Sequence, residues 1–189
     1  MNNEIKDVLN EIIDKEIVVS KKEDAYKSID TIERIYGVDL PLDYKEFLLE
    51  YGGCFINDNR MYQPIESTPV TPVDGFDSMG GFYGITNDTY DIESVIQTHM
   101  DVLGSNVMSI ADADGGDLIC IGLKDKYRGK IYYWYHEGET IDEDGKEYLY
   151  LIANSFEEFI LKFTLHEREK NVNLDDIELF LDDDLLKDE

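Results

Sequence analysis

The sequence "VMSIADADGGDLICIGL", residues 107–123, consists of two apolar runs joined by a short acidic, glycine-rich link. The runs at 107–111 and 117–123 have the length and the flanking turn formers of β-strands. In the link, the pair Gly115–Gly116 can take positive φ without steric cost, and aspartate carboxylates can accept hydrogen bonds from local backbone N–H groups. The stretch therefore predicts a β-hairpin whose turn is "DADGGD", residues 112–117.

The rest of the chain adds strand-like and helix-like segments on both sides of this hairpin. Further strand-like runs are bounded by turn formers at residues 82–86, 130–136 and 147–152. Apolar residues recur at helical spacing around residues 8–13, 29–36, 40–51, 91–104 and 155–163. Prolines at positions 64, 69 and 72 mark a long loop over about residues 65–81. The pattern predicts one domain in which helices pack on a sheet.

Three of the predicted helices carry more specific local features. Ser155 precedes Glu158 by three residues, which predicts a capping box in which the hydroxyl accepts from the backbone N–H of Glu158 and its carboxylate reaches back. The second helical segment ends at Gly37, and its apolar stripe consists of Ile29, Ile32, Ile35 and Tyr36. The third ends at Gly52, and we expect its apolar face to be buried: Tyr44, Phe47 and Leu48.

Composition places the chain among cytoplasmic proteins with a core of their own. Its 189 residues are 42% hydrophobic, which is enough for one buried core. The N-terminus is charged from Glu4 onward and no apolar run is long enough to span a bilayer, so we expect neither a signal peptide nor a membrane partner. Cys54 and Cys120 are the only cysteines, and two thiols without a disulfide framework are typical of a reducing compartment.

The charge of the chain is strongly negative and unevenly distributed. The formal net charge is −26, which repels the phosphates of nucleic acids and the headgroups of anionic membranes. From Met61 to Leu123 there is no Lys or Arg, but the same stretch contains ten acidic residues. Such a stretch can be a solvated face that keeps the protein soluble, or a docking surface for a basic protein.

Several short motifs resemble metal or catalytic sites without completing them. An EF-hand loop needs an oxygen ligand at its fifth position, Gly at its sixth and Glu at its twelfth. In a loop that starts at Asp112, these positions are occupied by Gly116, Asp117 and Leu123. "HEREK" at His166 lacks the second histidine of a zinc-protease helix. Cys120 lies in the apolar run "LICIG", where burial makes a thiol inert. We therefore expect no metal, no cofactor and no enzyme activity.

Five sequence blocks follow one another in an order that resembles a known family. They are "IERIYGVDLPLDYKEFLLEYGG", "FYGI", "VMSIADADGGDLICIGL", "GKIYYWYHE" and "IANSFEEFI". Together they resemble the SUKH superfamily, which includes bacterial toxin-immunity proteins and fungal cell-wall synthesis regulators. The resemblance covers about residues 29–163. We therefore expect a family-like domain over residues 1–170. The sequence 171–189 departs from the family pattern and is expected to be an acidic C-terminal extension, either one amphipathic helix or a disordered tail.

The resemblance implies an α+β fold and a binding role. The expected architecture is a single domain with a curved, mostly antiparallel sheet and helices packed around it. Gly115, Gly116 and Asp117 would form the turn before a central strand, and Trp134 would stand on the next strand. The implied role is non-enzymatic binding of another protein.

The most specific hypothesis is an immunity protein that neutralises a basic toxin, such as a nuclease. A toxin site that grips phosphates would be countered by carboxylates that speed the encounter. The alternative is an intracellular regulatory or scaffold module with a non-toxin partner. Trp134 is either an anchor on an exposed sheet face or a core residue. The candidate partner-binding residues are Asp74, Asp77, Asp112, Asp114, Asp117 and Trp134.

Overall fold

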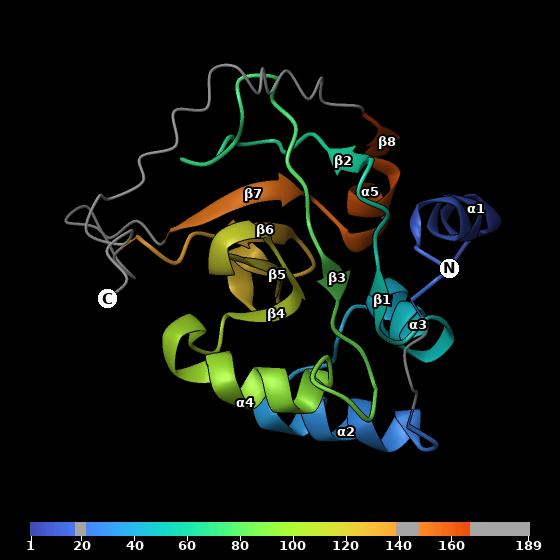
Figure 1. Cartoon of the computed structure of the whole chain (residues 1–189). Helices are drawn as coiled ribbons and strands as arrows, with labels where there is room; N and C mark the ends of the chain where they lie inside the picture. Colours follow the sequence, from blue (N-terminus) through green and yellow to red (C-terminus); the bar gives the residue numbers. More distant parts are fainter. Residues whose placement is uncertain (18–21, 139–147, 167–189) are drawn as a thin grey trace, which may run out of the picture.

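A six-stranded antiparallel sheet forms the centre of the protein (Figure 1). The computed structural model describes residues 1–17, 22–138 and 148–166. The strands of the main sheet, in spatial order, are β1 (Cys54–Phe55), β3 (Gly81–Phe82), β4 (Val107–Asp112), β5 (Leu118–Gly122), β6 (Ile131–Trp134) and β7 (Leu149–Ala153). A separate antiparallel pair joins β2 (Arg60–Tyr62) to β8 (Phe163–Leu165).

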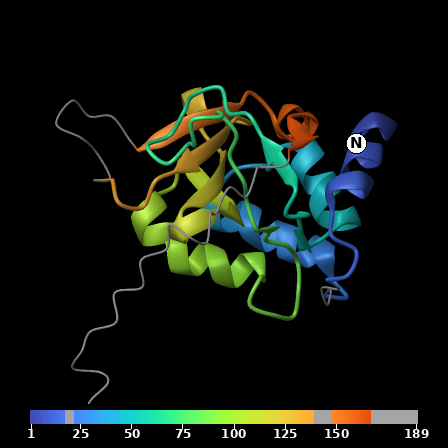
Figure 2. The same ribbon diagram turned by 45° about the horizontal axis from the view of Figure 1, so that its top comes forward.

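The helices gather in two groups around the sheet. They are α1 (Asn3–Ile12), α2 (Ala25–Tyr36), α3 (Leu42–Glu50), α4 (Ile92–Leu103) and α5 (Phe156–Leu161). Helices α2 and α4 lie side by side along one face of the sheet, whereas α1, α3 and α5 cluster toward the β1 and β3 edge (Figures 1 and 2). The α+β class and the mostly antiparallel sheet are therefore confirmed.

The helix boundaries follow the predicted capping chemistry, with one change. Gly37 ends α2 in the left-handed conformation, at φ 66°. The Ser155 hydroxyl accepts from the backbone N–H of Glu158 at 3.0 Å, which is one half of the predicted capping box. The Glu158 carboxylate, however, accepts from the backbone N–H and side-chain amide of Asn154 instead of the backbone of Ser155.

An aromatic cluster joins α3 and α5 to the sheet. Tyr44, Phe47 and Leu48 are buried, as the helical spacing predicted. The Phe47 ring centroid lies 4.9 Å from that of Phe82 on β3 and 5.0 Å from that of Phe156 on α5. Aromatic pairs at this spacing stabilise a core beyond the area they bury. The cluster therefore fixes β3 and the segments on either side of it.

The structure corrects one detail of the predicted fold and narrows another. The strand expected at 82–86 is only Gly81–Phe82, because the backbone of Gly84 hydrogen-bonds to Tyr90 and Ile92 instead of β4. Gly84 also packs directly on the backbone of Gly52 and Gly53, where a Cβ atom would overlap. On the apolar stripe of α2, Ile29, Ile32 and Tyr36 are buried, whereas Ile35 is 40% exposed, so the stripe is wider than the buried face.

No helix of the described part of the chain is both long and apolar enough to cross a membrane.

Candidate functional site

The link between β4 and β5 forms the predicted hairpin turn. Gly115 and Gly116 have φ values of 74° and 96°, in the region that favours glycine. The backbone N–H of Ala113 donates to the carbonyl of Asp117 at 3.0 Å and closes the turn. The hairpin itself is antiparallel, with Asp112 opposite Leu118.

The aspartates of this turn do not cap the turn's own backbone, which corrects the prediction. Asp112 Oδ1 accepts from the backbone N–H of Gly81 at 2.6 Å, and Asp114 Oδ2 accepts from the Ser78 hydroxyl at 2.6 Å. Both donors belong to the long loop and strand that precede β4 by about thirty residues. The carboxylates therefore connect the hairpin turn to a neighbouring segment.

Asp117 is the most enclosed member of the group. Its carboxylate accepts from the Tyr133 hydroxyl at 2.5 Å and, on the other oxygen, from the His136 backbone N–H at 2.8 Å. The His136 Nδ1 atom also lies 2.6 Å from that second oxygen. Burial and the hydrogen bond to Asp117 raise the pKa of Tyr133, so its proton stays on the phenol and is donated to the carboxylate. Asp117 is one of the candidate partner-binding residues, but its side chain is buried and its carboxylate is hydrogen-bonded within the protein.

The two aspartates of the long loop differ in exposure. Asp77 is buried, its carboxylate accepts from the Thr71 hydroxyl at 3.1 Å, and its backbone exchanges two hydrogen bonds with Tyr62. Asp74 is exposed, and its carboxylate lies 3.3 Å from His166 Nε2. The His166 ring stacks on Phe76 with centroids 4.3 Å apart. These contacts hold the loop against β2 and β8.

These groups surround a hollow of about 270 Å³, here called the acidic hollow. Its lining comprises Val70, Pro72, Asp77, Ser78, Asp114, Gly115, Asp117, Tyr133, Tyr135, His136 and Glu137. Within residues 1–17, 22–138 and 148–166, neither Lys nor Arg lines it. Asp114 and Glu137 are exposed at its edge, and the Tyr135 hydroxyl donates to Glu137 at 2.6 Å.

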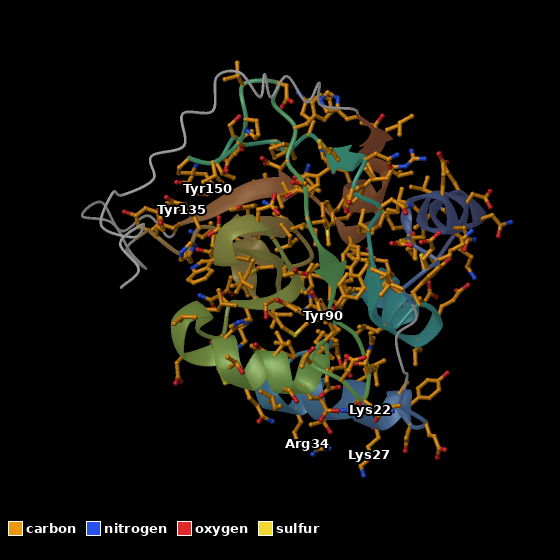
Figure 3. The ribbon with its side chains drawn as sticks, in the orientation of Figure 1. Lys22, Lys27, Arg34, Tyr90, Tyr135 and Tyr150 are labelled. Carbon is orange, nitrogen blue, oxygen red and sulfur yellow. The ribbon has the colours of Figure 1, made fainter. Side chains whose placement is uncertain are left out.

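Exposed apolar side chains stand beside this hollow. Val70 is 47% exposed and Val73 is fully exposed. Figure 3 places Tyr135 near Tyr150 on the β6–β7 side of the molecule, far from Lys27 and Arg34 on α2. The acidic hollow therefore combines surface carboxylates, aromatic rings and aliphatic side chains at a distance from these two cations.

Trp134 does not belong to the acidic hollow. Successive side chains of a strand point to opposite faces of a sheet, so Trp134 and Tyr133 are on different sides. Trp134 is partly buried and lines a second depression, here called the tryptophan groove, between the end of α4 and the β6–β7 pair. The groove is about 250 Å³ in volume, and its other lining residues are Asp101, Val102, Leu103, Gly104, Ser105, Asn106, Val107, Tyr148 and Leu149. Trp134 is thus neither a fully buried core residue nor a fully exposed anchor on the sheet face.

The acidic stretch from Met61 to Leu123 does not form one continuous surface. Asp91 and Glu93 begin α4 and are paired with Lys22, whose Nζ atom lies 2.7 Å from Asp91 Oδ1 and 3.3 Å from Glu93 Oε1. The expected single docking surface is therefore divided, and the acidic hollow contains only part of it.

Tyr133 and His136, the hydrogen-bond partners of Asp117, were not predicted from the sequence. The alternation in "IYYWYHE" is a signal that places Tyr133 and Trp134 on opposite faces of the strand.

The described residues contain no group of three or more His, Cys, Asp or Glu side chains that could hold a metal ion. Cys54 and Cys120 are buried, and burial raises the pKa of the Cys120 thiol far above its usual range. Burial also lowers the pKa of His99, whose Nδ1 lies 3.1 Å from the Ser109 hydroxyl. The two thiols are therefore part of the core, and His99 is held against β4 by its contact with Ser109.

Comparison with known proteins gives two findings. The sequence profile of the SMI1 / KNR4 family (SUKH-1) matches residues 27–162, most of the chain. The chain is also 36% identical over 178 residues to the SPbeta prophage-derived uncharacterized protein YokK of Bacillus subtilis (strain 168). That alignment covers 85% of this chain and 89% of the Bacillus protein.

Proposed function

Because the chain belongs to the SMI1 / KNR4 family (SUKH-1), we propose that it is a non-enzymatic domain that binds a basic protein at the acidic hollow. The observation that carries this proposal is the composition of the hollow. Exposed Asp114 and Glu137 stand at its edge, Tyr135 and Val70 supply apolar contact area, and the described residues that line it include neither Lys nor Arg. Charged edges accelerate encounter, and aromatic or aliphatic groups stabilise the complex once formed.

The internal hydrogen bonds of the hollow support a preformed surface. Asp117 and Asp77 are buried and accept hydrogen bonds from side chains of the protein itself. Ser78 donates to Asp114 and orients it. A surface fixed in this way loses little conformational entropy on binding, which favours affinity at a given contact area.

We further propose that the partner is a toxin domain and that the chain is its cytoplasmic immunity protein. The resemblance to SUKH immunity proteins supports this class, and the charge of −26 supports a cationic partner such as a nuclease. A regulatory or scaffold module remains the alternative. The two are separated by what the partner does: an immunity protein restores growth of cells that express the partner, and a regulator does not.

The test begins with capture of the partner by the full chain from its native cell, followed by identification. Two double variants then compare equal changes in charge. Asp114→Asn with Glu137→Gln neutralises the edge of the hollow, whereas Glu23→Gln with Asp30→Asn neutralises two exposed acids before and on α2. We expect the first pair to reduce capture at low salt and the second to leave it unchanged. Equal capture by both would contradict the proposed site.

A further inference from the structure

The tryptophan groove offers a binding site on the opposite face of β6 from the acidic hollow. We propose that it is a second docking site, which takes a protein segment presenting a large apolar side chain next to Lys or Arg. This inference extends the proposed function, since it adds a second contact for a basic partner.

The groove has the size and the walls to hold one large apolar side chain. Its volume is about 250 Å³, and a protein cavity of about 150 Å³ is enough to bind benzene. Val107 is buried, Leu103, Trp134 and Leu149 are partly buried, and Val102 at the lip is 43% exposed. A partly exposed Trp in an apolar depression is a frequent anchor of protein interfaces.

The lip of the groove carries negative charge. Helix α4 ends here, and the C-terminal end of a helix has a partial negative charge from its backbone carbonyls. The last turn contains no basic residue, and it contains the exposed Asp101, which adds a full negative charge where the helix itself would favour a cation. Over the part of the chain that the structure describes, no Lys or Arg lines the groove. A cation from outside the chain is therefore complementary to this lip.

The same charges disfavour two occupants: a second copy of the chain and the C-terminal sequence 171–189. A second copy brings another net charge of −26. The sequence from 171 to 189 contains apolar residues but carries eight acids against one lysine, Lys187, so it has the same sign as Asp101. A basic, apolar segment of another protein is the occupant that matches both the walls and the lip.

The chain contains a single tryptophan, so its fluorescence reports on the groove alone. The probe is the tryptophan-free peptide acetyl-Lys-Lys-Phe-Leu-Lys-Lys-amide, titrated into the full chain. Matched probes replace each Lys by Glu, or replace Phe and Leu by Ala. We expect saturable blue-shifted emission with the first peptide, and at least tenfold weaker binding of both matched probes. Equal binding of the Lys and Glu peptides would overturn the proposal.

Two variants and a matched control locate the site. Val102→Lys places a charge at the exposed lip, and Asp101→Asn removes the lip's carboxylate; both should weaken the Lys peptide several-fold. The control Val73→Lys introduces the same change at an exposed valine beside the acidic hollow, and it should leave binding of the Lys peptide unchanged. If Val102→Lys binds like the unaltered chain, the peptide does not occupy the groove and the proposal is wrong.

Two other outcomes would assign the groove to the chain itself. Concentration-dependent dimers that Val102→Lys abolishes would identify a second copy as the occupant. Tighter peptide binding after Ile177→Ser and Phe180→Ser in the full chain would identify the C-terminal sequence. With the captured partner, loss of binding in Asp114→Asn/Glu137→Gln but not in Val102→Lys overturns the groove and leaves the proposed function intact. The reverse pattern supports the groove and contradicts the hollow.

Discussion

The two faces of β6 place their polar groups in different ways. On the Tyr133 side, buried Asp77 and Asp117 accept hydrogen bonds from the protein, and exposed carboxylates remain at the edge of the hollow. On the Trp134 side, the walls are mostly apolar, and Asp101 is the charged side chain among the described residues that line the groove. Adjacent residues of one strand therefore take part in two surfaces, one polar and preorganised, the other mostly apolar.

This contrast separates carboxylates that maintain the fold from carboxylates that are available to a partner. Removing a buried acceptor leaves its donors without hydrogen bonds, whereas removing an exposed charge changes mainly long-range electrostatics. The predictions below test that distinction, beginning with the core that both surfaces share.

The largest effect is expected for Phe47→Ala. Phe47 is fully buried and packs on both Phe82 and Phe156, so truncation leaves a cavity beneath the sheet. We expect a loss of about 3–5 kcal/mol in the free energy of unfolding, measured by urea denaturation. Ile35→Ala, at a 40% exposed position of α2, is the control and should cost much less. Similar losses in the two variants would contradict the described core.

Asp117→Ala should be next in size, because it leaves the Tyr133 hydroxyl and the His136 backbone N–H without their acceptor. We expect a loss of about 2–3 kcal/mol by the same measurement. Asp114→Ala removes an exposed carboxylate of the same turn and should cost under about 1 kcal/mol. If the two variants are equally stable, the buried hydrogen bonds of Asp117 do not stabilise the fold more than those of Asp114.

Alkaline pH provides a third comparison. The folded-state pKa of Tyr133 is raised above the ordinary value of 10.0, by burial first and then by the hydrogen bond to Asp117. The folded protein therefore holds this proton more tightly than the unfolded chain does. Its contribution to stability is complete below pH 10 and declines as pH rises above that value. We expect Tyr133→Phe to flatten this decline in denaturation curves between about pH 9 and 11.5. An unchanged slope would show that Tyr133 does not contribute.

Calcium should have the smallest effect. The acidic turn directs Asp112 and Asp114 toward Gly81 and Ser78, and the sequence lacks the twelfth-position Glu of a calcium loop. A ligand that binds the folded state weakly adds almost nothing to stability at concentrations near about 1 mM. We expect the same Tm with calcium and with chelator. An upward shift in Tm that Asp112→Asn removes would identify a cation site.

The hairpin turn and the strands after it could be predicted from sequence because they depend on local chemistry. Gly115 and Gly116 can take positive φ without steric cost wherever the rest of the chain lies, and both do so in the structure. The early end of β3 could not be predicted, because it depends on the hydrogen bonds of the Gly84 backbone and on its packing against Gly52 and Gly53, over thirty residues away. Local patterns do not contain such long-range contacts.

The candidate site was predicted less completely for the same reason. An acidic run in sequence does not indicate which carboxylates are buried, and burial separates Asp117 from Asp114 only three residues before it. Likewise, the donors that occupy Asp112 and Asp114 come from Gly81 and Ser78, which no spacing rule links to the turn. The resemblance to a family indicated the fold, but it did not distinguish the two faces of β6.

The central claim is that exposed carboxylates at the acidic hollow attract a basic partner. Stopped-flow association of the captured partner with the Asp114→Asn/Glu137→Gln variant tests it most directly, with Glu23→Gln/Asp30→Asn as the charge-matched control. We predict an on-rate several-fold lower for the first variant at low salt. The difference should disappear near 1 M salt, where the Debye length is about 3 Å, and the control should match the unaltered protein. Equal on-rates for both variants at every salt concentration would contradict the claim.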